Sequence, residues 1–457
     1  MGTTAFSQFI EDALRFSTPG ISVGARALGM GGAYTGVAND YSALYWNPAG
    51  LSQLQFGEFS FGLSYLNHGD RSTFLGATQS LSSNALKLNS LGIAYPVPVK
   101  RGSLVLAFGY NRQSDFTTGM SFKAFNPSGS IVQAWAPDSS FYPNDITLAE
   151  DLKLAIADTN TGRFNSPIKG RLTQLGKATE EGGLNNWSAG ASIDVAKNLA
   201  IGLSLTYVTG TYKYSRTYRE QDNNGVYTQF PFDFDELLVE DDVHSDLSGV
   251  NARFGLMYRQ PDRFRFGIAV KTPTSFRIKE TFNTTTRSSF DNGDVYGPFD
   301  SPGSNQYDVV TPWVFSAGAS VIIRDLVLSG DVEYTDWTQM EFQDANQDLL
   351  NKNRDIKDFF RATANLRAGA EYHVQDMGLR IRGGFIYNPS PYQGDPSSYD
   401  QKYATAGLGV PLGESAMLDI GYARGWWNTR RINYDGSPDV NEKVTTNNIV
   451  ATVSVRF

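Results

Sequence analysis

Arginines and carboxylates on alternating positions of apolar segments are the residues with the clearest chemistry in this sequence. A guanidinium binds a carboxylate through two parallel hydrogen bonds, so an inward-facing arginine could hold an acidic ligand. The candidates for that role are Arg253, Arg367 and Arg382. Most of these charges should instead pair with one another across neighbouring strands. The charges concerned are Arg253, Arg259, Arg265, Lys271, Arg367, Arg380 and Arg382 against Asp194, Asp331, Glu333, Glu371 and Asp419.

Catalytic and metal-binding patterns are absent from the sequence. The chain has no Cys, and its three histidines, His68, His244 and His373, stand far apart. A metal site needs several ligands at suitable spacing, and nucleophilic catalysis needs a base beside the nucleophile. We therefore expect no enzymatic activity, no cofactor and no bound metal.

Charge and hydropathy exclude two further classes. The net charge of −8 argues against a nucleic-acid partner, which requires a basic surface. The acidic segment 233–246 is expected to be a solvated loop. No apolar run reaches the about 18 residues of a transmembrane helix. The first residues lack the basic and apolar regions of a secretory signal, so an exported protein would begin near its mature end.

The dominant pattern is a period of two, which is typical of a strand with two different faces. It is clearest in the segments 59–65, 187–195, 250–258 and 362–372. The second face is rich in Gly, Ser and Asn, which favours the lumen of a barrel over the open surface of a soluble sheet. The segments are also long enough to cross a bilayer when tilted, at about 9–11 residues each.

The connections between these segments alternate in length. Short turns, such as 196–198 and 375–378, separate long polar connections, such as 220–244 and 283–308, of which 121–183 is the longest. Short periplasmic turns and long outer loops are the arrangement of outer-membrane barrels. The sequence therefore predicts an all-β fold, an antiparallel transmembrane β-barrel of about fourteen strands.

The end of the chain agrees with that location. Ile449, Ala451, Val453 and Val455 form one apolar face that ends on Phe457. A terminal aromatic residue on an alternating strand resembles the recognition signal of outer-membrane assembly. We expect the barrel to lie in the bacterial outer membrane, in contact with its lipid and lipopolysaccharide.

Residues 1–55 do not alternate. Phe6, Phe9, Ile10, Ala13 and Leu14 have the spacing of one face of a short helix, and a run dense in glycine follows. The segment is too apolar for a solvated tail. We therefore predict two domains, an N-terminal plug at 1–55, called the hatch below, and a barrel at 56–457 that encloses it.

The glycine-dense run contains the segments Arg26–Tyr34 (RALGMGGAY), Ala38–Asp40 (AND) and Asn47–Leu51 (NPAGL). These segments resemble the hatch of the FadL family of outer-membrane transporters for long-chain fatty acids and hydrocarbons. The resemblance implies a fourteen-stranded barrel with a lateral opening in its wall, here near 47–50 and the strand 103–119. It also implies a set of hatch and gate residues, namely Gly29, Gly31, Gly32, Asn47, Pro48, Ala49 and Gly50.

The same resemblance implies a function. We expect passive transport of hydrophobic small molecules, which outer loops capture and a hatch movement releases sideways. The run 45–49 is also similar to the barrel shuttle proteins of type IX secretion. The alternative function is therefore a barrel that anchors a surface or secretion complex and binds a protein partner at its outer loops.

Aromatic and aliphatic side chains provide the remaining ligand-binding candidates. They are Phe6, Phe9, Leu14 and Phe16 in the hatch helix, and Trp135 and Phe141 in the long outer loop. Two simpler interpretations stay open. The hatch residues could only attach the plug to the wall, and the loop could be a self-packed cap over the barrel mouth.

Overall fold

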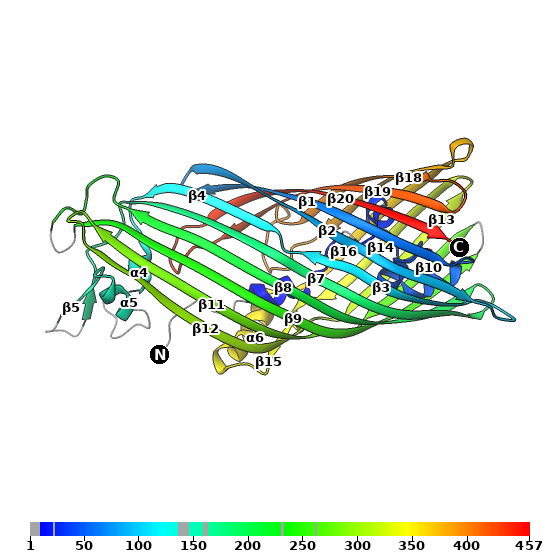
Figure 1. Cartoon of the computed structure of the whole chain (residues 1–457), viewed down its shortest axis with the longest axis horizontal. Helices are drawn as coiled ribbons and strands as arrows, with labels where there is room; N and C mark the ends of the chain where they lie inside the picture. The colour runs from blue at the N-terminus through cyan, green and yellow to red at the C-terminus, as the bar shows by residue number, and fades with distance from the viewer. Residues whose placement is uncertain (1–9, 22, 136–145, 159–162, 230–232, 261–262) are drawn as a thin grey trace.

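The computed structural model describes residues 10–21, 23–135, 146–158, 163–229, 233–260 and 263–457. These residues form a closed antiparallel barrel of fourteen strands, as predicted (Figure 1). Four barrel strands are interrupted and carry two labels each, namely β3–β4, β10–β11, β12–β13 and β14–β15. The ladder between β1 and β20 closes the ring, from Glu58 opposite Arg456 to Thr73 opposite Asn441.

The barrel strands are β1 (Glu58–Phe74), β2 (Ala77–Val97), β3 (Leu104–Asp115), β4 (Thr118–Asn126), β7 (Leu172–Ala196), β8 (Leu199–Gln221), β9 (Phe234–Gln260), β10 (Phe264–Lys271), β11 (Ser275–Phe290), β12 (Val295–Val310), β13 (Val314–Ile323), β14 (Leu326–Asp336), β15 (Glu341–Gln343), β16 (Ala362–Val374), β17 (Leu379–Asn388), β18 (Gln401–Pro411), β19 (Ala416–Arg431) and β20 (Val440–Arg456). The helices are α1 (Ile10–Ser17), α2 (Ala25–Gly29), α3 (Ala43–Trp46), α4 (Ile131–Trp135), α5 (Ile146–Asp151) and α6 (Gln347–Phe359), with 3-10 turns η1 (Pro48–Gln53), η2 (Trp337–Gln339) and η3 (Gln375–Met377). A small hairpin, β5 (Ile156–Asp158) and β6 (Arg163–Asn165), lies in the long outer loop.

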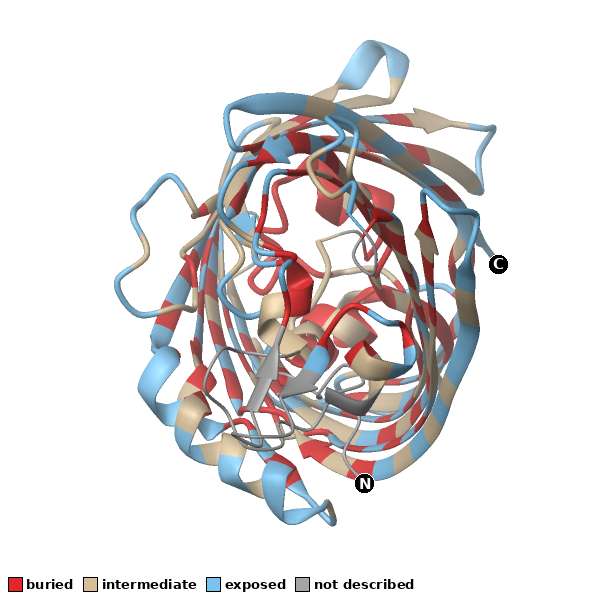
Figure 2. Cartoon of the chain, turned by 90° about the vertical axis from the view of Figure 1, so that its left-hand side faces the viewer, coloured by how far each residue is buried: buried red, intermediate tan, exposed pale blue. Residues whose placement is uncertain are grey.

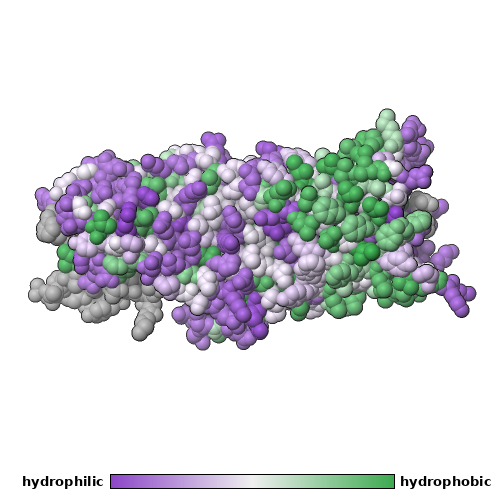
Figure 3. All heavy atoms as spheres, viewed as in Figure 1, coloured by the Kyte–Doolittle hydropathy of each residue, from purple (hydrophilic) through white to green (hydrophobic). Residues whose placement is uncertain are grey.

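The alternation has the predicted orientation. On β1, the side chains of Phe59, Phe61 and Leu63 are 41–42% exposed, whereas the intervening Ser60 is 4% exposed. Apolar side chains therefore face outward and polar ones face the lumen. Figure 3 shows the outward apolar residues gathered in a band around the end of the barrel that holds the C-terminus. This band matches the lipid-facing belt of an outer-membrane barrel.

The strands continue far beyond this band, which corrects the predicted loop boundaries. Strands β7, β8 and β9 have 25, 23 and 27 residues. The segment 233–246, expected to be a loop, lies almost entirely in β9, and 283–308 is largely the paired β11 and β12. The loop expected at 121–183 is reduced to 127–171. The prediction was wrong because the extension has solvent outside it, so its outward face is polar. Its apolar side chains, such as Leu237 and Val239 on β9, face inward instead.

The hatch elements α2, α3 and η1 lie inside the barrel. Nearly every residue from Val23 to Leu54 is buried, and the buried helices lie within the ring of strands in Figure 2. No helix in the described ranges is long and apolar enough to cross a membrane.

Candidate ligand site and hatch

Glycines on both sides create the contact between hatch and wall. Eight of the nine barrel strands from β8 to β19, all except β14, carry an inward glycine that touches the hatch backbone. A Cβ added at Gly384 would lie 2.5 Å from the Gly31 nitrogen, and one at Gly407 would lie 2.9 Å from Gly29 Cα. Only glycine permits this approach of backbone to backbone. The wall glycines are Gly202, Gly255, Gly267, Gly318, Gly369, Gly384, Gly407 and Gly421.

Charged and polar groups of the wall then bind the hatch. Arg26 makes two 2.8 Å hydrogen bonds to the carboxylate of Glu371 on β16. Asp331 on β14 accepts hydrogen bonds from the backbone N–H groups of Tyr34 and Thr35, at 2.9 and 2.6 Å. Charge-assisted bonds of this kind are stronger than neutral ones. The segment from Val23 to Leu54 is therefore firmly attached to the barrel.

The Asn-Pro-Ala triplet belongs to this attached part. Asn47 donates hydrogen bonds to the carbonyls of Thr35, at 3.0 Å, and of Leu256 on β9, at 3.2 Å. Its own oxygen accepts from Ala49 N–H at 3.1 Å. Gly202 and Gly255 face Pro48 and Asn47 from β8 and β9. The triplet thus packs mainly against β7, β8 and β9, so it is the anchor of the hatch on that side.

The wall is broken elsewhere, between β3 and β4. The ladder of β2 with β3 stops at Ser90 opposite Asn111, and beyond it β4 pairs with β7 alone. A bulge between Arg112 and Ser114 starts the break. On the other side of the break, Gly182 has φ +112°, a conformation that favours glycine. The break lies in the strand segment 103–119 where the resemblance places a lateral opening.

The hatch segment that reaches the break is α1 and the residues after it. Gly20 N–H donates a 3.0 Å hydrogen bond to the carbonyl of Gln113. Phe16, only 1% exposed, packs edge-on against Phe116 in the break and against Tyr212 on β8, with ring centroids 6.0 Å apart in both pairs. Leu14 lies at the edge of the same cluster. Of the predicted hatch candidates, Phe16 is thus in direct contact with the wall break.

A small cavity lies between this segment, the hatch and the wall. Gln113 at the break lines it, as do Pro19 and Tyr45 of the hatch and Arg253 and Lys271 of the wall. Arg253 and Lys271 stand directly opposite each other in the β9–β10 ladder. Neither has a carboxylate within ion-pair distance among the described residues.

The groups around these two cations offset their positive charge only in part. The Arg253 guanidinium lies 5.0 Å from the ring centroid of Tyr45 and donates to the Trp46 carbonyl at 3.4 Å. Burial raises the pKa of Tyr45, so its hydroxyl stays neutral. Glu333 also lines the cavity, but both of its oxygens accept hydrogen bonds from Arg367. The cavity therefore holds an excess of positive charge.

The other two candidate arginines are already paired. Arg367 binds Glu333 at 2.8 Å, and Arg382, whose side chain is fully buried, binds Glu371 and Asp419, both at 2.7 Å. Arg367 and Arg382 therefore both show the cross-strand pairing that was expected of most charges. Arg253 is the candidate whose charge has no such partner in the described residues.

The described part of the outer loop packs against the extracellular end of the wall. Ile131, Val132, Leu152 and Leu154 are buried in one apolar cluster with wall residues such as Phe122, and Trp135 packs at its edge. This packing agrees with the interpretation of a self-packed cap. Phe141, like Phe6 and Phe9, lies outside the described residues.

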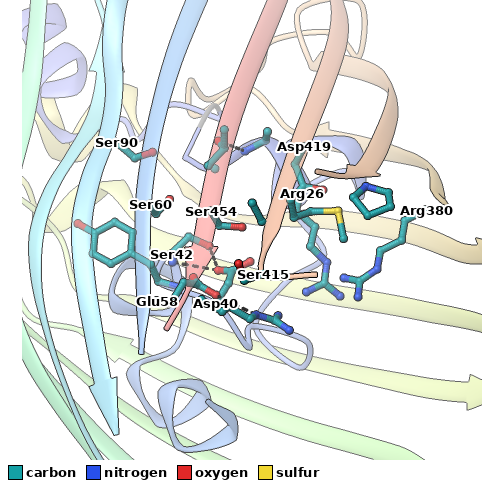
Figure 4. Close-up of a pocket in the computed structure, with 18 of the residues that line it drawn as sticks. Arg26, Asp40, Ser42, Glu58, Ser60, Ser90, Arg380, Ser415, Asp419 and Ser454 are labelled. Carbon is teal, nitrogen blue, oxygen red and sulfur yellow. Dashed lines mark hydrogen bonds and ion pairs between the residues drawn. The ribbon is translucent and has the colours of Figure 1, made fainter. Parts of the chain in front are cut away.

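A second cavity, of about 120 Å³, opens at the periplasmic end beside the hatch. Figure 4 shows charged and hydroxyl side chains around it, among them Arg26, Asp40, Glu58 and Arg380. Such a lining favours water over an apolar molecule. Within the described ranges, no group of three or more metal-binding side chains is arranged to hold an ion.

Three features of the site were not predicted. The sequence identified Lys271 only as an inward-facing charge. Its position opposite Arg253 follows from the register of the β9–β10 ladder, which the sequence does not reveal. Phe116 occupies a two-residue interruption that has no sequence pattern of its own. The wall glycines had a signal, because glycine recurs on the polar face of the alternating segments.

Comparisons with solved structures show the same fold. A FadL homologue of Pseudomonas aeruginosa superposes with a TM-score of 0.61 at 13% identity, covering 95% of this chain and 98% of that one. The toluene transporters TodX of P. putida and TbuX of Ralstonia pickettii give TM-scores of 0.57 and 0.53 at 12% and 16% identity. Both comparisons cover 96% of this chain and 99% of the other.

At the level of sequence, no curated protein matches the chain. The family model described as outer membrane protein transport protein (OMPP1/FadL/TodX) matches residues 163–457, which is more than half of the sequence. This match begins beyond the hatch and covers the barrel from the outer loop to the last strand. The chain therefore belongs to the OMPP1/FadL/TodX family, whose members are outer-membrane transport channels for hydrophobic compounds.

Proposed function

We propose that this barrel carries carboxylate-bearing amphiphiles, of which long-chain fatty acids are the model, passively across the outer membrane. The observation that carries the proposal is the pair Arg253 and Lys271, which face each other across one ladder in a cavity where the described residues supply no free anion. Like charges directly opposite each other destabilise a sheet, and a buried charge without a partner is costly. A ligand carboxylate between the two side chains removes both costs.

The apolar part of the ligand has a place next to that cavity. The cluster around Phe16, Phe116 and Tyr212 continues to Leu247 and Ile278 on the wall. The helix α1 now fills this space with Ala13 and Phe16. In the proposed mechanism, the alkyl chain takes the place of α1 while the carboxylate lies at Arg253 and Lys271. The residues 1–55 act as one domain in which 10–21 is the moving part.

Release follows from the position of the break. When α1 leaves, Phe16 no longer covers Phe116, and the bond from Gly20 to Gln113 is lost. The ligand then passes sideways through the wall between β2 and β4. A path straight through the hatch is disfavoured, because the periplasmic cavity is lined by charged groups. Gly29, Gly31, Gly32 and the segment 47–50 hold the remaining hatch in place and do not move.

Uptake by cells without another fatty-acid transporter tests the proposal. Cells that express the barrel should take up oleate faster than control cells, and faster than they take up an alkene of the same length without the carboxylate. Equal uptake of acid and alkene contradicts the role of the two cations. A barrel that lacks residues 1–20 should remain folded and lose this selectivity, and unchanged selective uptake would contradict the role of α1.

A further inference from the structure

One sector of the extracellular wall is not made of strands. Residues Val295–Tyr307 of β12 pair with β11 on one side, but on the other side β12 pairs with β15 only from Asp308 to Val310. The next barrel strand, β16, begins at Ala362 and pairs with β14 no higher than Asp336. Above that level, no strand in the described part of the chain continues the wall next to β12. Pro298 and Pro302 on β12 are typical of such an unpaired edge.

The helix α6 fills this window. It follows β15, lies beside β12 and β15 in Figure 1, and meets the segment after β17 through a bridge of Phe360 with Tyr392. The rings of that pair are 4.8 Å apart. Asn353 fastens the middle of the helix by hydrogen bonds to the backbone N–H and carbonyl of Phe342, at 2.8 and 2.9 Å. Arg361 and Gln393 add side-chain hydrogen bonds to the carbonyls of Ser390 and Phe360, each at 3.0 Å. The window is thus closed by α6, the bridge and these bonds.

The two faces of α6 differ strongly. Leu349 and Ile356 are 4% and 0% exposed and belong to the same apolar cluster as Ala13 and Phe16 of α1. The other face carries charges, including the pair of Lys352 with Asp355 at 3.3 Å. Removal of α6 would therefore expose the chamber of α1 directly to the outside of the barrel, at the side rather than through the mouth.

The window lies at the height where the outer leaflet ends. Trp313, just before β13, and Tyr334 on β14 are 41% and 46% exposed, as expected of the aromatic girdle at a membrane interface. Phe359 at the end of α6 is 56% exposed. In Figure 3 the polar surface of α6 borders the hydrophobic band. The helix α6 therefore lies next to the level that a hydrophobic molecule in the outer leaflet reaches.

The axial route is blocked at the same time. Beyond the apolar cap of the outer loop, Arg431 of β19 binds Glu180 on the opposite wall at 2.7 Å. Arg216 donates to the carbonyl of Asn433 at 2.7 Å, and Tyr434 accepts from Gln174 at 2.9 Å. The two walls are thus joined across the mouth, so a ligand that enters along the axis must break these polar contacts.

We propose that α6 is a side lid through which hydrophobic ligands pass from the outer leaflet into the chamber of α1. This inference rests on the proposed function, and it adds a second lateral opening, for entrance, to the opening at β3–β4. The lid opens by separation of α6 from the segment at Tyr392. The apolar contacts of Leu349 and Ile356 then transfer to the ligand.

A disulfide that locks the lid tests the inference, because the natural chain has no cysteine. The variant is Phe360→Cys with Tyr392→Cys. Partners in an antiparallel bridge have Cα atoms about 4.5–5.5 Å apart, within the range of a disulfide. The matched control is Thr73→Cys with Thr78→Cys, which closes an equivalent pair at the β1–β2 hairpin. The probe is uptake of oleate by expressing cells, measured before and after reduction of the disulfide.

We expect the locked lid to lose most of its oleate uptake and to recover it on reduction, while the control is equal in both states. Equal uptake by the locked and reduced lid overturns the inference and leaves the proposed function intact. Failure of the unmodified barrel to take up oleate overturns both.

A second measurement does not depend on the double variant. The single variant Ile356→Cys should react with a membrane-impermeant maleimide on whole cells, and faster when oleate is present. Met257→Cys, which is also fully buried but lies beside the hatch anchor, should stay unlabelled. Protection of Ile356→Cys in both conditions contradicts a moving lid.

Discussion

Lys271 and Arg253 are direct cross-strand partners, and both side chains line the cavity that ends at Gln113 in the wall break. Two cations in this relationship repel each other, and Glu333, the only carboxylate that the described part of the chain places on the cavity wall, is bound to Arg367. The repulsion is tolerable in a protein whose ligand brings the missing anion. The relationship links head-group recognition and release, because the cations and the break share one cavity.

Replacement of both cations tests this link. In the variant Arg253→Met with Lys271→Met, oleate should bind about 10–100-fold more weakly, since a hydrogen bond to a charged group contributes about 1.5–3 kcal/mol. An uncharged alkene of equal length should bind as before. The measurement is the Kd of the purified barrel for each ligand. Arg424→Met, at an exposed position on β19, is the control and should change neither Kd.

The sequence was sufficient to predict the barrel, because lipid outside and polar groups inside impose a strict period of two on segments such as 59–65. It was not sufficient for the extracellular extension. There the outward face of β9 is polar, and its apolar side chains, such as Leu237 and Val239, face inward instead. The acidic run 233–246 therefore has the composition of a loop, and such a strand can be identified only from its neighbours in the sheet.

The candidate site could likewise be predicted only in part from the sequence. Arg253 was predicted as a ligand-binding residue together with Arg367 and Arg382, because all three are inward arginines. What separates them is the position of carboxylates on neighbouring strands, which depends on register. The wall break could not be located within the strand 103–119, although Gly182 and Gly183, which face it, are visible in the sequence.

The contact of Phe16 with Phe116 should control leakage through the break. Truncation in the variant Phe116→Ala removes a buried ring between α1 and the wall, which typically costs about 3–5 kcal/mol. We expect faster basal uptake of hydrophobic dyes and weaker protection of α1 against protease. Phe264→Ala, which removes an outward ring on β10, should leave both unchanged. Unchanged basal dye uptake and unchanged protease protection of α1 in Phe116→Ala would show that α1 is not the gate.

The glycine contacts between hatch and wall allow a test with two adjacent residues. A Cβ at Gly384 lies 2.5 Å from Gly31 N, whereas a Cβ at Gly383 meets only the Thr405 carbonyl at 3.9 Å. Gly384→Ala should therefore displace the hatch, lower the melting temperature and raise the ion conductance in planar bilayers. Gly383→Ala should behave like the natural protein. Equal behaviour of the two variants would mean that the hatch can shift at no cost.

The carboxylate of Glu371 binds two arginines, Arg26 of the hatch and Arg382 of the wall. In the variant Glu371→Gln, both lose their ion pair with residue 371, and Arg26 is left without the contact that fixes α2 to β16. Breaking a buried pair costs about 3–5 kcal/mol, so we expect a lower unfolding temperature and release of the hatch before the barrel. Arg382 keeps its ion pair with Asp419, which should preserve the wall itself.

Thermal unfolding, followed by protease cleavage within residues 23–54, distinguishes release of the hatch from unfolding of the barrel. Asp376→Asn, at an exposed turn, is the control. Simultaneous loss of hatch and barrel in Glu371→Gln would show that the two do not unfold separately.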